Sequence, residues 1–160
     1  MLRIGRLADY AILILYQLGK VQPARLSMDS IAELTHLPLP TVRKVMKYLV
    51  DAELVISKRG PNGGYQLAMS PARLSIARGI EAVEGPIALT ECCSHAASCE
   101  LHDRCDLADR WPGVNTIVAR VLERTTLADL DRFGRAEPHV PPPLRALFGP
   151  ASAAAETDGS

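Results

Sequence analysis

The four cysteines of the chain lie within a single stretch of fourteen residues. Cys93, Cys99 and Cys105 are evenly spaced, with five residues in each gap, and Cys92 stands directly before the first of them. Gaps of this size are too wide for one face of a helix, so the segment must loop to bring three thiols to a common centre. Thiolates are soft donors that suit iron–sulfur clusters and zinc. The clustering therefore predicts metal or redox chemistry, since a disulfide framework would spread its cysteines along the chain.

Other interpretations of the cysteines stay open at this point. Zinc sites more often use cysteine pairs two to four residues apart, and that spacing is absent. Buried free thiols and a redox disulfide are the remaining structural interpretations. A thiol redox enzyme using Cys92 and Cys93 would be a different class of function, but the sequence has no CxxC motif and no obvious cofactor loop. No Ser/His/Asp set or phosphate loop stands out, so we expect a protein that is not an enzyme.

Two short helices joined by a tight turn are predicted before the cysteines. Ser27 is a suitable N-cap for the first helix, over residues 28–35. A turn over residues 36–40 leads to the second helix, over residues 41–52, whose outer face is basic and polar. This pattern is typical of a helix-turn-helix with its recognition helix. The side chains expected to face inward are Ile31, Ala32 and Leu34 on the first helix and Val42, Val45, Met46 and Leu49 on the second.

A β-hairpin is predicted directly after the second helix. Residues 54–57 and 65–68 are short β-prone runs on either side of a Gly-rich turn, which makes them the wing of a winged helix. A wing and a basic helix together predict binding to double-stranded operator DNA, with phosphate contacts from lysines and groove contacts from arginines. The expected DNA-binding residues are Thr41, Arg43, Lys44, Lys47, Lys58, Arg59, Asn62 and Gly63.

The charge of the chain divides between its halves, although the total is zero. Residues 1–80 carry eleven Lys and Arg against five Asp and Glu, a net of +6. Residues 81–160 carry seven against thirteen, a net of −6. A basic N-terminal half is typical of a part that meets a polyanion.

Two further helices are predicted, one before the helix-turn-helix and one after the wing. The first, over residues 5–19, has one apolar stripe at helical spacing and a second apolar patch around Asp9, so we expect one side to meet its own core and the other to be available to a partner subunit. The stripe is Ile4, Leu7, Ala11, Ile14, Leu15 and Leu18, and the patch is Ile12, Leu13 and Tyr16. This helix is too short for a membrane span and contains Asp9 and Gln17, so a cytoplasmic protein without a membrane partner is expected.

The second of these helices is expected to mediate dimerisation. It runs over about residues 112–124, after a shorter helix over residues 76–84 that Ser75 can cap. Little is left in the chain to cover its apolar face, so a two-fold contact between subunits would satisfy it. That face consists of Val114, Ile117, Val118, Val121 and Leu122.

Residues 1 to about 132 resemble the iron–sulfur winged-helix transcription regulators of the IscR and NsrR type. The most specific match is the wing motif from Arg59 to Ala68, and the evenly spaced cysteines match as well. Segment 89–93, together with Trp111 and Asn115, is most similar to the subgroup that regulates SUF-type cluster assembly operons. Shorter matches are Asp9-Tyr10-Ala11, Leu54-Val55 and Glu84-Gly85-Pro86.

The resemblance implies a homodimer that binds a pseudo-palindromic operator, and an iron–sulfur cluster (2Fe–2S or 4Fe–4S) whose state changes DNA affinity. It assigns the cluster to Cys93, Cys99 and Cys105. IscR-like members have a histidine three residues after the third cysteine, where this chain has Ala108, so an IscR-like fourth ligand is in doubt. The resemblance also matches Asp9 to a carboxylate that reaches the cluster across the dimer in some relatives, and a carboxylate at an apolar contact needs a partner. A salt bridge to an arginine or an exposed turn is the alternative for Asp9, while His95, His102 and Cys92 are further thiol or imidazole groups nearby.

The expected fold is mainly α, a winged helix-turn-helix with a two-stranded β wing and a long C-terminal dimerisation helix. We expect a DNA-binding domain over residues 1–85, a cysteine loop and dimerisation helix over 86–134, and a disordered tail over 135–160. The expected function is a transcription regulator, a repressor of iron–sulfur assembly genes that senses through its cluster. The alternative with the same fold is a nitric oxide or redox sensing regulator.

Overall fold

The computed structural model describes residues 3–94, 99 and 104–133, and it is mainly α-helical. The predicted tail over residues 135–160 and the loop histidines His95 and His102 lie outside the described residues. The α-helices are α1 (Arg6–Val21), α2 (Met28–Thr35), α3 (Leu39–Asp51), α4 (Ile76–Glu84), α5 (Trp111–Arg124) and α6 (Leu127–Phe133). The strands are β1 (Val55–Lys58) and β2 (Gly64–Leu67), and two 3-10 helices are η1 (Pro71–Arg73) and η2 (Glu91–Cys93). The predicted mainly α winged helix is confirmed.

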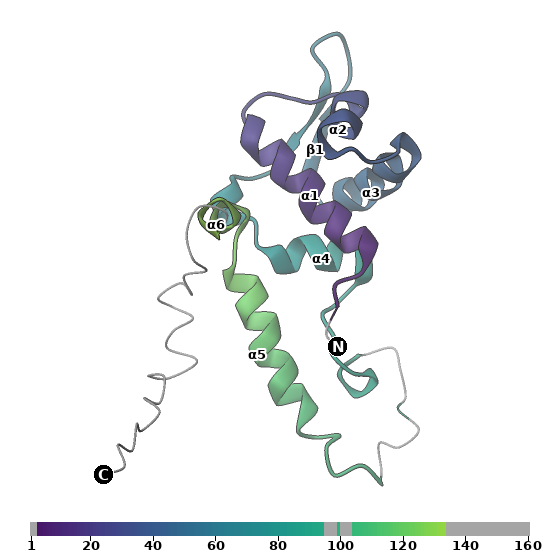
Figure 1. Cartoon of the computed structure of the whole chain (residues 1–160), viewed down its shortest axis with the longest axis vertical. Coiled ribbons are helices and arrows are strands. Elements are labelled where there is room, and N and C mark those ends of the chain that lie inside the picture. Colours follow the sequence, from purple (N-terminus) through teal and green to yellow (C-terminus); the bar gives the residue numbers. More distant parts are fainter. Residues whose placement is uncertain (1–2, 95–98, 100–103, 134–160) are drawn as a thin grey trace, which may run out of the picture.

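The molecule is elongated, with the winged part at one end. Figure 1 shows α1, α2, α3 and the hairpin gathered together, while α5 extends away from them toward the cysteine segment. Helix α4 lies between these two parts and packs against both α1 and α5. Helix α6 returns to the winged part, where Leu127 is buried in its core. The chain therefore returns to the winged part after the predicted domain boundary at residue 85, and α6 packs there.

Helix α1 supplies the centre of the core. Its buried residues follow the helical period, as the sequence pattern predicts, although Ile4 precedes the helix and is 49% exposed. Helices α2, α3, α4 and α6 and strand β2 all pack against α1. Each large aliphatic side chain that leaves water here contributes on the order of 1.5–3 kcal/mol. The buried residues of α1 are Ala8, Ala11, Ile14, Leu15 and Leu18.

Local capping explains where the helices begin. The Ser27 hydroxyl accepts a hydrogen bond from the Ser30 N–H at 3.0 Å, and the Ser75 hydroxyl accepts one from the Arg78 N–H at 3.3 Å. Both caps confirm the predicted starts of α2 and α4. Helix α3 begins at Leu39, two residues before the predicted start, because Pro40 is tolerated in a first helical turn.

The inward side of α2 differs from the prediction. Leu34 is 44% exposed, so its predicted place in the core is wrong. Thr35 is buried instead, and its hydroxyl donates to the Ile31 carbonyl at 2.6 Å. Ile31 and Thr35 lie one turn apart on the side of α2 that packs against α1 and α3, whereas Leu34 lies outside that side.

The hairpin is fastened to the helix-turn-helix by a short bridge. Strands β1 and β2 are antiparallel, with Val55 opposite Leu67 and Lys58 opposite Gly64. Outside the hairpin, the Leu26 N–H donates to the Tyr65 carbonyl at 3.0 Å, and the Tyr65 N–H donates to the Leu26 carbonyl at 2.8 Å. Gly64 has a φ of +131°, and a Cβ at this position would lie 2.8 Å from the Leu26 carbonyl oxygen. Glycine is therefore required for the close approach.

The second apolar side of α1 is partly covered by its own chain. Ile12 lies against Gly79 of α4, and the Tyr16 hydroxyl donates to a carboxylate oxygen of Asp131 in α6 at 2.6 Å. Leu13 is half-buried and Asp9 is exposed. Less of this side is thus available to a partner subunit than the sequence pattern suggests.

Replacing Gly79 by Leu is expected to destabilise the fold. A Cβ at this position would already lie 2.4 Å from Ile12 Cδ1 and 3.2 Å from Leu15 Cδ1. Overpacking of this kind costs about 1–3 kcal/mol. The control is Gly113→Leu in α5, where a Cβ would meet nothing within 4 Å and helix propensity favours Leu by somewhat under about 1 kcal/mol. Denaturant unfolding of both variants checks this, and equal midpoints would contradict the close packing of α1 on α4.

Candidate functional site

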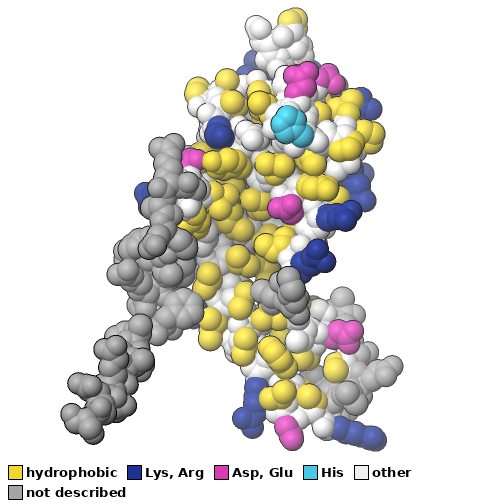
Figure 2. Space-filling model, in the orientation of Figure 1, with side chains coloured by type: hydrophobic (Ala, Val, Ile, Leu, Met, Phe, Trp, Pro, Cys, Tyr) yellow, Lys and Arg dark blue, Asp and Glu magenta, His cyan; other side chains and the backbone are white. Residues whose placement is uncertain are grey.

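The orientation of α3 is fixed by its buried side. Val42, Val45, Met46 and Leu49 are all buried, as predicted. The opposite side is therefore turned to solvent, and Figure 2 shows Lys and Arg side chains gathered along the edge of the molecule where α3 lies. Of the predicted DNA-binding residues on this helix, Arg43, Lys44 and Lys47 are exposed and Thr41 is half-buried.

The wing presents its polar residues on a tight turn. Arg59 and Asn62 are exposed in the loop, and Lys58 is the last residue of β1. The turn is closed by a hydrogen bond from the Gly63 N–H to the Gly60 carbonyl at 2.8 Å. A Cβ at Gly63 would lie 2.4 Å from the Lys58 carbonyl oxygen, so any larger residue would force the loop open.

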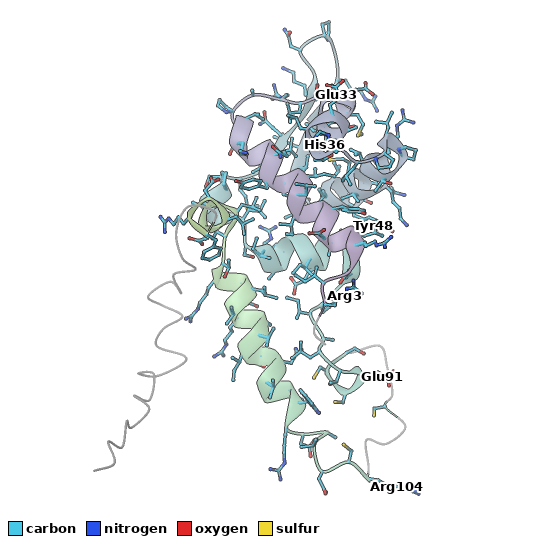
Figure 3. The ribbon with its side chains drawn as sticks, in the orientation of Figure 1. Arg3, Glu33, His36, Tyr48, Glu91 and Arg104 are labelled. Carbon is cyan, nitrogen blue, oxygen red and sulfur yellow. The ribbon has the colours of Figure 1, made fainter. Side chains whose placement is uncertain are left out.

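Helix α3 and the hairpin form one continuous surface. A hollow of about 240 Å³ lies between them, with Arg43 and Lys47 on one side and Ser57 and Tyr65 on the other. The predicted DNA-binding residues of the helix and of the wing thus come from adjacent elements. Tyr48 was not predicted here, but it is 37% exposed on α3 and is labelled in Figure 3. Its position directly after Lys47 and four residues after Lys44 was the signal that could have found it.

The cysteines lie at the opposite end of the molecule from the wing. Cys92 and Cys93 are half-buried in η2, which packs against α5, and the Thr90 hydroxyl lies 3.0 Å and 3.3 Å from their respective Sγ atoms. Cys99 is half-buried, Cys105 is exposed, and none of the four cysteines forms a disulfide. Figure 3 shows Glu91 and Arg104 at this end, far from Glu33 on α2 and from His36 directly after that helix.

The predicted metal ligands are not assembled into a closed site in the described part of the chain. Within residues 3–94, 99 and 104–133, no group of three or more His, Cys, Asp or Glu side chains is close enough to hold a metal ion. Cys93, Cys99 and Cys105 thus form no such group there, and neither does Asp9, which is exposed in the first turn of α1. Eight of the eleven residues between Cys93 and Cys105 lie outside the described residues.

The segment before the cysteines is tied to α5 by a side chain whose role the sequence reasoning missed. Asn115 accepts a hydrogen bond from the Leu89 N–H and donates one to the Ile87 carbonyl, both at 2.9 Å. The sequence indicated Asn115 only as part of the resemblance to the SUF-type subgroup. The signal that could have found it is a polar residue within an otherwise apolar helical face.

The outer face of α5 is not covered by the part of the chain that the structure describes. Val114 and Ile117 are 44% and 51% exposed, and no residue of α5 is fully buried. Figure 2 shows hydrophobic side chains continuing from the winged part along this helix. Beside it, a hollow of about 490 Å³ is lined by Ile87, Leu89 and Val118, among others. Among the helices that the structure describes, none has both the length and the apolar character needed to cross a bilayer.

The comparisons with known proteins agree with the winged-helix fold. A family model described as "Rrf2: Iron-dependent Transcriptional regulator" matches residues 4–132. The HTH-type transcriptional regulator NsrR of Oceanobacillus iheyensis is 30% identical over 131 residues, covering 81% of this chain and 89% of that protein.

Solved structures of known proteins have a similar fold. CymR (YrzC), the global cysteine regulator of B. subtilis, has a TM-score of 0.67 and 30% identity, covering 83% of this chain and 98% of that one. IscR of T. potens has a TM-score of 0.62 and 26% identity, covering 83% and 88%. These relatives are named as regulators and not as enzymes. Because the family model spans the winged part, the cysteine segment and α5, the chain belongs to the Rrf2 family of winged-helix transcription regulators.

Proposed function

We propose that this regulator represses iron–sulfur cluster assembly genes and senses through an iron–sulfur cluster held by Cys93, Cys99 and Cys105. The observation that carries the proposal is the position of the cysteine segment. It adjoins α5, the helix with an uncovered apolar face, and α4 links α5 to the core that orients α3. A change at the cysteines thus has a short packed route to the DNA-binding surface.

The DNA contacts are proposed from the exposed residues of α3 and the wing. Lys44, Lys47 and Lys58 are placed to contact phosphates, as is the backbone N–H group at Asn62. Gly63 contributes to the interface by shaping the wing turn, because its own N–H donates to the Gly60 carbonyl. The groove contacts are assigned to Thr41, Arg43 and Arg59, since arginine can bind a guanine edge with two hydrogen bonds.

The uncovered face of α5 supports a homodimer. Val114 and Ile117 project from α5 into solvent, and exposed apolar patches on a helix mark a site of association. A second copy of the chain offers the same face, so a two-fold contact would cover both at once. Two winged helices would then bind an operator with two half-sites.

The donor set fits an iron–sulfur cluster. Three thiols without disulfides are present on a short segment, and iron–sulfur clusters are held by cysteine thiolates. Such a group would supply redox and ligand-exchange chemistry, and free thiols of this kind suit a cytoplasmic protein. Asp9 of a second subunit is the proposed fourth ligand, because its side chain is exposed on α1.

A nitric oxide or redox sensor of the same fold is the alternative function. The adjacent thiols of Cys92 and Cys93, both within hydrogen-bond distance of the Thr90 hydroxyl, favour it, because a spare thiol beside a ligand could take part in oxidation. The two functions are separated by measuring operator release from the loaded protein, that is, the protein with its cluster bound. Release is measured after exposure to nitric oxide, to peroxide and to a chelator.

Removing single basic residues tests the DNA interface. Arg59→Ala is expected to weaken operator binding by about 1–3 kcal/mol and to relax sequence preference, since a base contact is lost. Lys47→Ala should weaken binding to all sequences and reduce the log–log salt slope by about one. Arg73→Ala is the matched control, because Arg73 is exposed on η1, which packs against α6 away from the wing. Salt-dependent operator titrations measure this, and unchanged affinity for Arg59→Ala would remove the wing from the interface.

Replacing each cysteine by Ala tests the ligand set. Cys93→Ala, Cys99→Ala and Cys105→Ala are expected to lose the cluster, whereas Cys92→Ala retains it, because only the first three are evenly spaced. Iron and sulfide content after anaerobic purification, with the visible spectrum, gives the readout. Full retention of iron in Cys99→Ala would refute the assignment, and loss only in Cys92→Ala would show that its neighbour is the ligand.

Operator titrations of the loaded and the cluster-free protein test the coupling. We expect the loaded form to bind about 5–150-fold more tightly, which is the usual range for coupled sites, because a cluster stabilises one arrangement of the dimer. Both titrations use one salt concentration, and the mass of each form in solution is measured alongside. Equal affinities would show that the cluster is structural. A monomeric cluster-free form would show that the cluster acts through dimerisation and not through the spacing of the two recognition helices in the dimer.

A further inference from the structure

We infer that Asn115 is a positioning residue that fixes the Cys93 end of the cysteine segment to α5. The inference deepens the proposed function and rests on it, because it takes Cys93 as a ligand and α5 as the dimer helix. The position of the first ligand and the orientation of α5 are then coupled through one side-chain amide.

One side-chain amide contacts two backbone groups of the segment, two residues apart. The Asn115 Oδ1 atom accepts from the Leu89 N–H and the Nδ2 group donates to the Ile87 carbonyl, and both distances are 2.9 Å. In an extended chain, the carbonyl of one residue and the N–H of the second residue after it point to the same side. One amide therefore satisfies two backbone groups and fixes the register of the segment as well as its distance from α5.

The surroundings make these hydrogen bonds costly to lose. Asn115 is half-buried between the apolar residues of α5, and the two backbone groups that it contacts are part-buried. A polar group that loses its partner away from water carries a desolvation cost, so the segment gains from staying attached.

Local hydrogen bonds connect this attachment to Cys93. Thr90 follows Leu89 directly, and its carbonyl accepts from the Cys93 N–H at 2.9 Å, while its hydroxyl lies 3.3 Å from the Cys93 Sγ. The Ser94 N–H then donates to the Glu91 carbonyl at 3.1 Å. Cys93 is thus hydrogen-bonded to Thr90, the residue directly after the Asn115 contact, so a displacement of Cys93 strains the attachment to α5.

The other end of the cysteine segment also leads into α5. The Ala108 N–H donates to the Cys105 carbonyl at 3.1 Å, and the Trp111 N–H at the start of α5 donates to the Leu107 carbonyl at 3.1 Å. Cys93 and Cys105 are therefore held near the same helix from two sides. Drawing the three thiols to one centre would strain both attachments. Asn115 differs from the groups at the Cys105 end because its side chain joins two segments far apart in the sequence, whereas the Arg110 side chain donates to the Asp106 carbonyl only four residues away.

The test uses Asn115→Leu, which keeps the size of the side chain but removes both hydrogen bonds. Thr116→Val is the matched control, because the hydroxyl of Thr116 only donates to the Pro112 carbonyl of its own helix. In the full-length cluster-free protein, alkylation of each cysteine with iodoacetamide is followed by peptide mass spectrometry, together with hydrogen exchange across segment 87–94. Asn115→Leu is expected to raise the alkylation rate of Cys93 several-fold and to speed exchange at Leu89, with Cys105 and the control unchanged.

Unchanged Cys93 alkylation in a folded Asn115→Leu variant would overturn the inference. If that variant does not fold, Asn115→Asp, which keeps the acceptor for Leu89 but loses the donor to Ile87, decides it by the same measurement. In the loaded protein, Asn115→Leu should also reduce the difference in operator affinity between loaded and cluster-free forms to less than about twofold, against about 5–150-fold for coupled sites. If the unaltered protein shows no such difference, the proposed sensing fails, whereas the alkylation result still decides the role of Asn115.

Discussion

The burial of α1 against its neighbours is the interaction on which the rest of the structure depends. Helices α2, α3, α4 and α6 and strand β2 each contact this one helix. Gly79 permits α4 to approach closely, because a side chain there would occupy the space of Ile12. The rotation of α3 and the direction of α5 both follow from these contacts, so the DNA-binding surface and the cysteine segment share one support.

The features that could be predicted from the sequence are those set by neighbouring residues. Helical periodicity placed the buried residues of α1 and α3, Ser27 and Ser75 marked helix starts, and the glycines between residues 60 and 64 marked the wing. Each of these signals acts over a few residues, where backbone sterics and capping determine the conformation.

The features that were missed depend on contacts between distant residues. Thr35 in place of Leu34 on the inner side of α2 is decided by what α1 and α3 leave open. The return of Leu127 to the first domain and the hydrogen bonds of Asn115 to Ile87 and Leu89 join residues far apart in the sequence. The even spacing of the cysteines indicated a common centre, but the distances between their sulfur atoms depend on a loop whose path spacing alone does not determine.

Helix α5 buries little of its apolar surface against the described part of its own chain, so these contacts contribute little to its stability. Helix α5 has fourteen residues and no fully buried one, and an isolated helix of that length is marginal in water. If a second copy covers it, the gain in stability follows mass action and grows with the concentration of the chain. The abundance of such a regulator in the cell would then set how much of it is fully folded, in addition to how much of it is present.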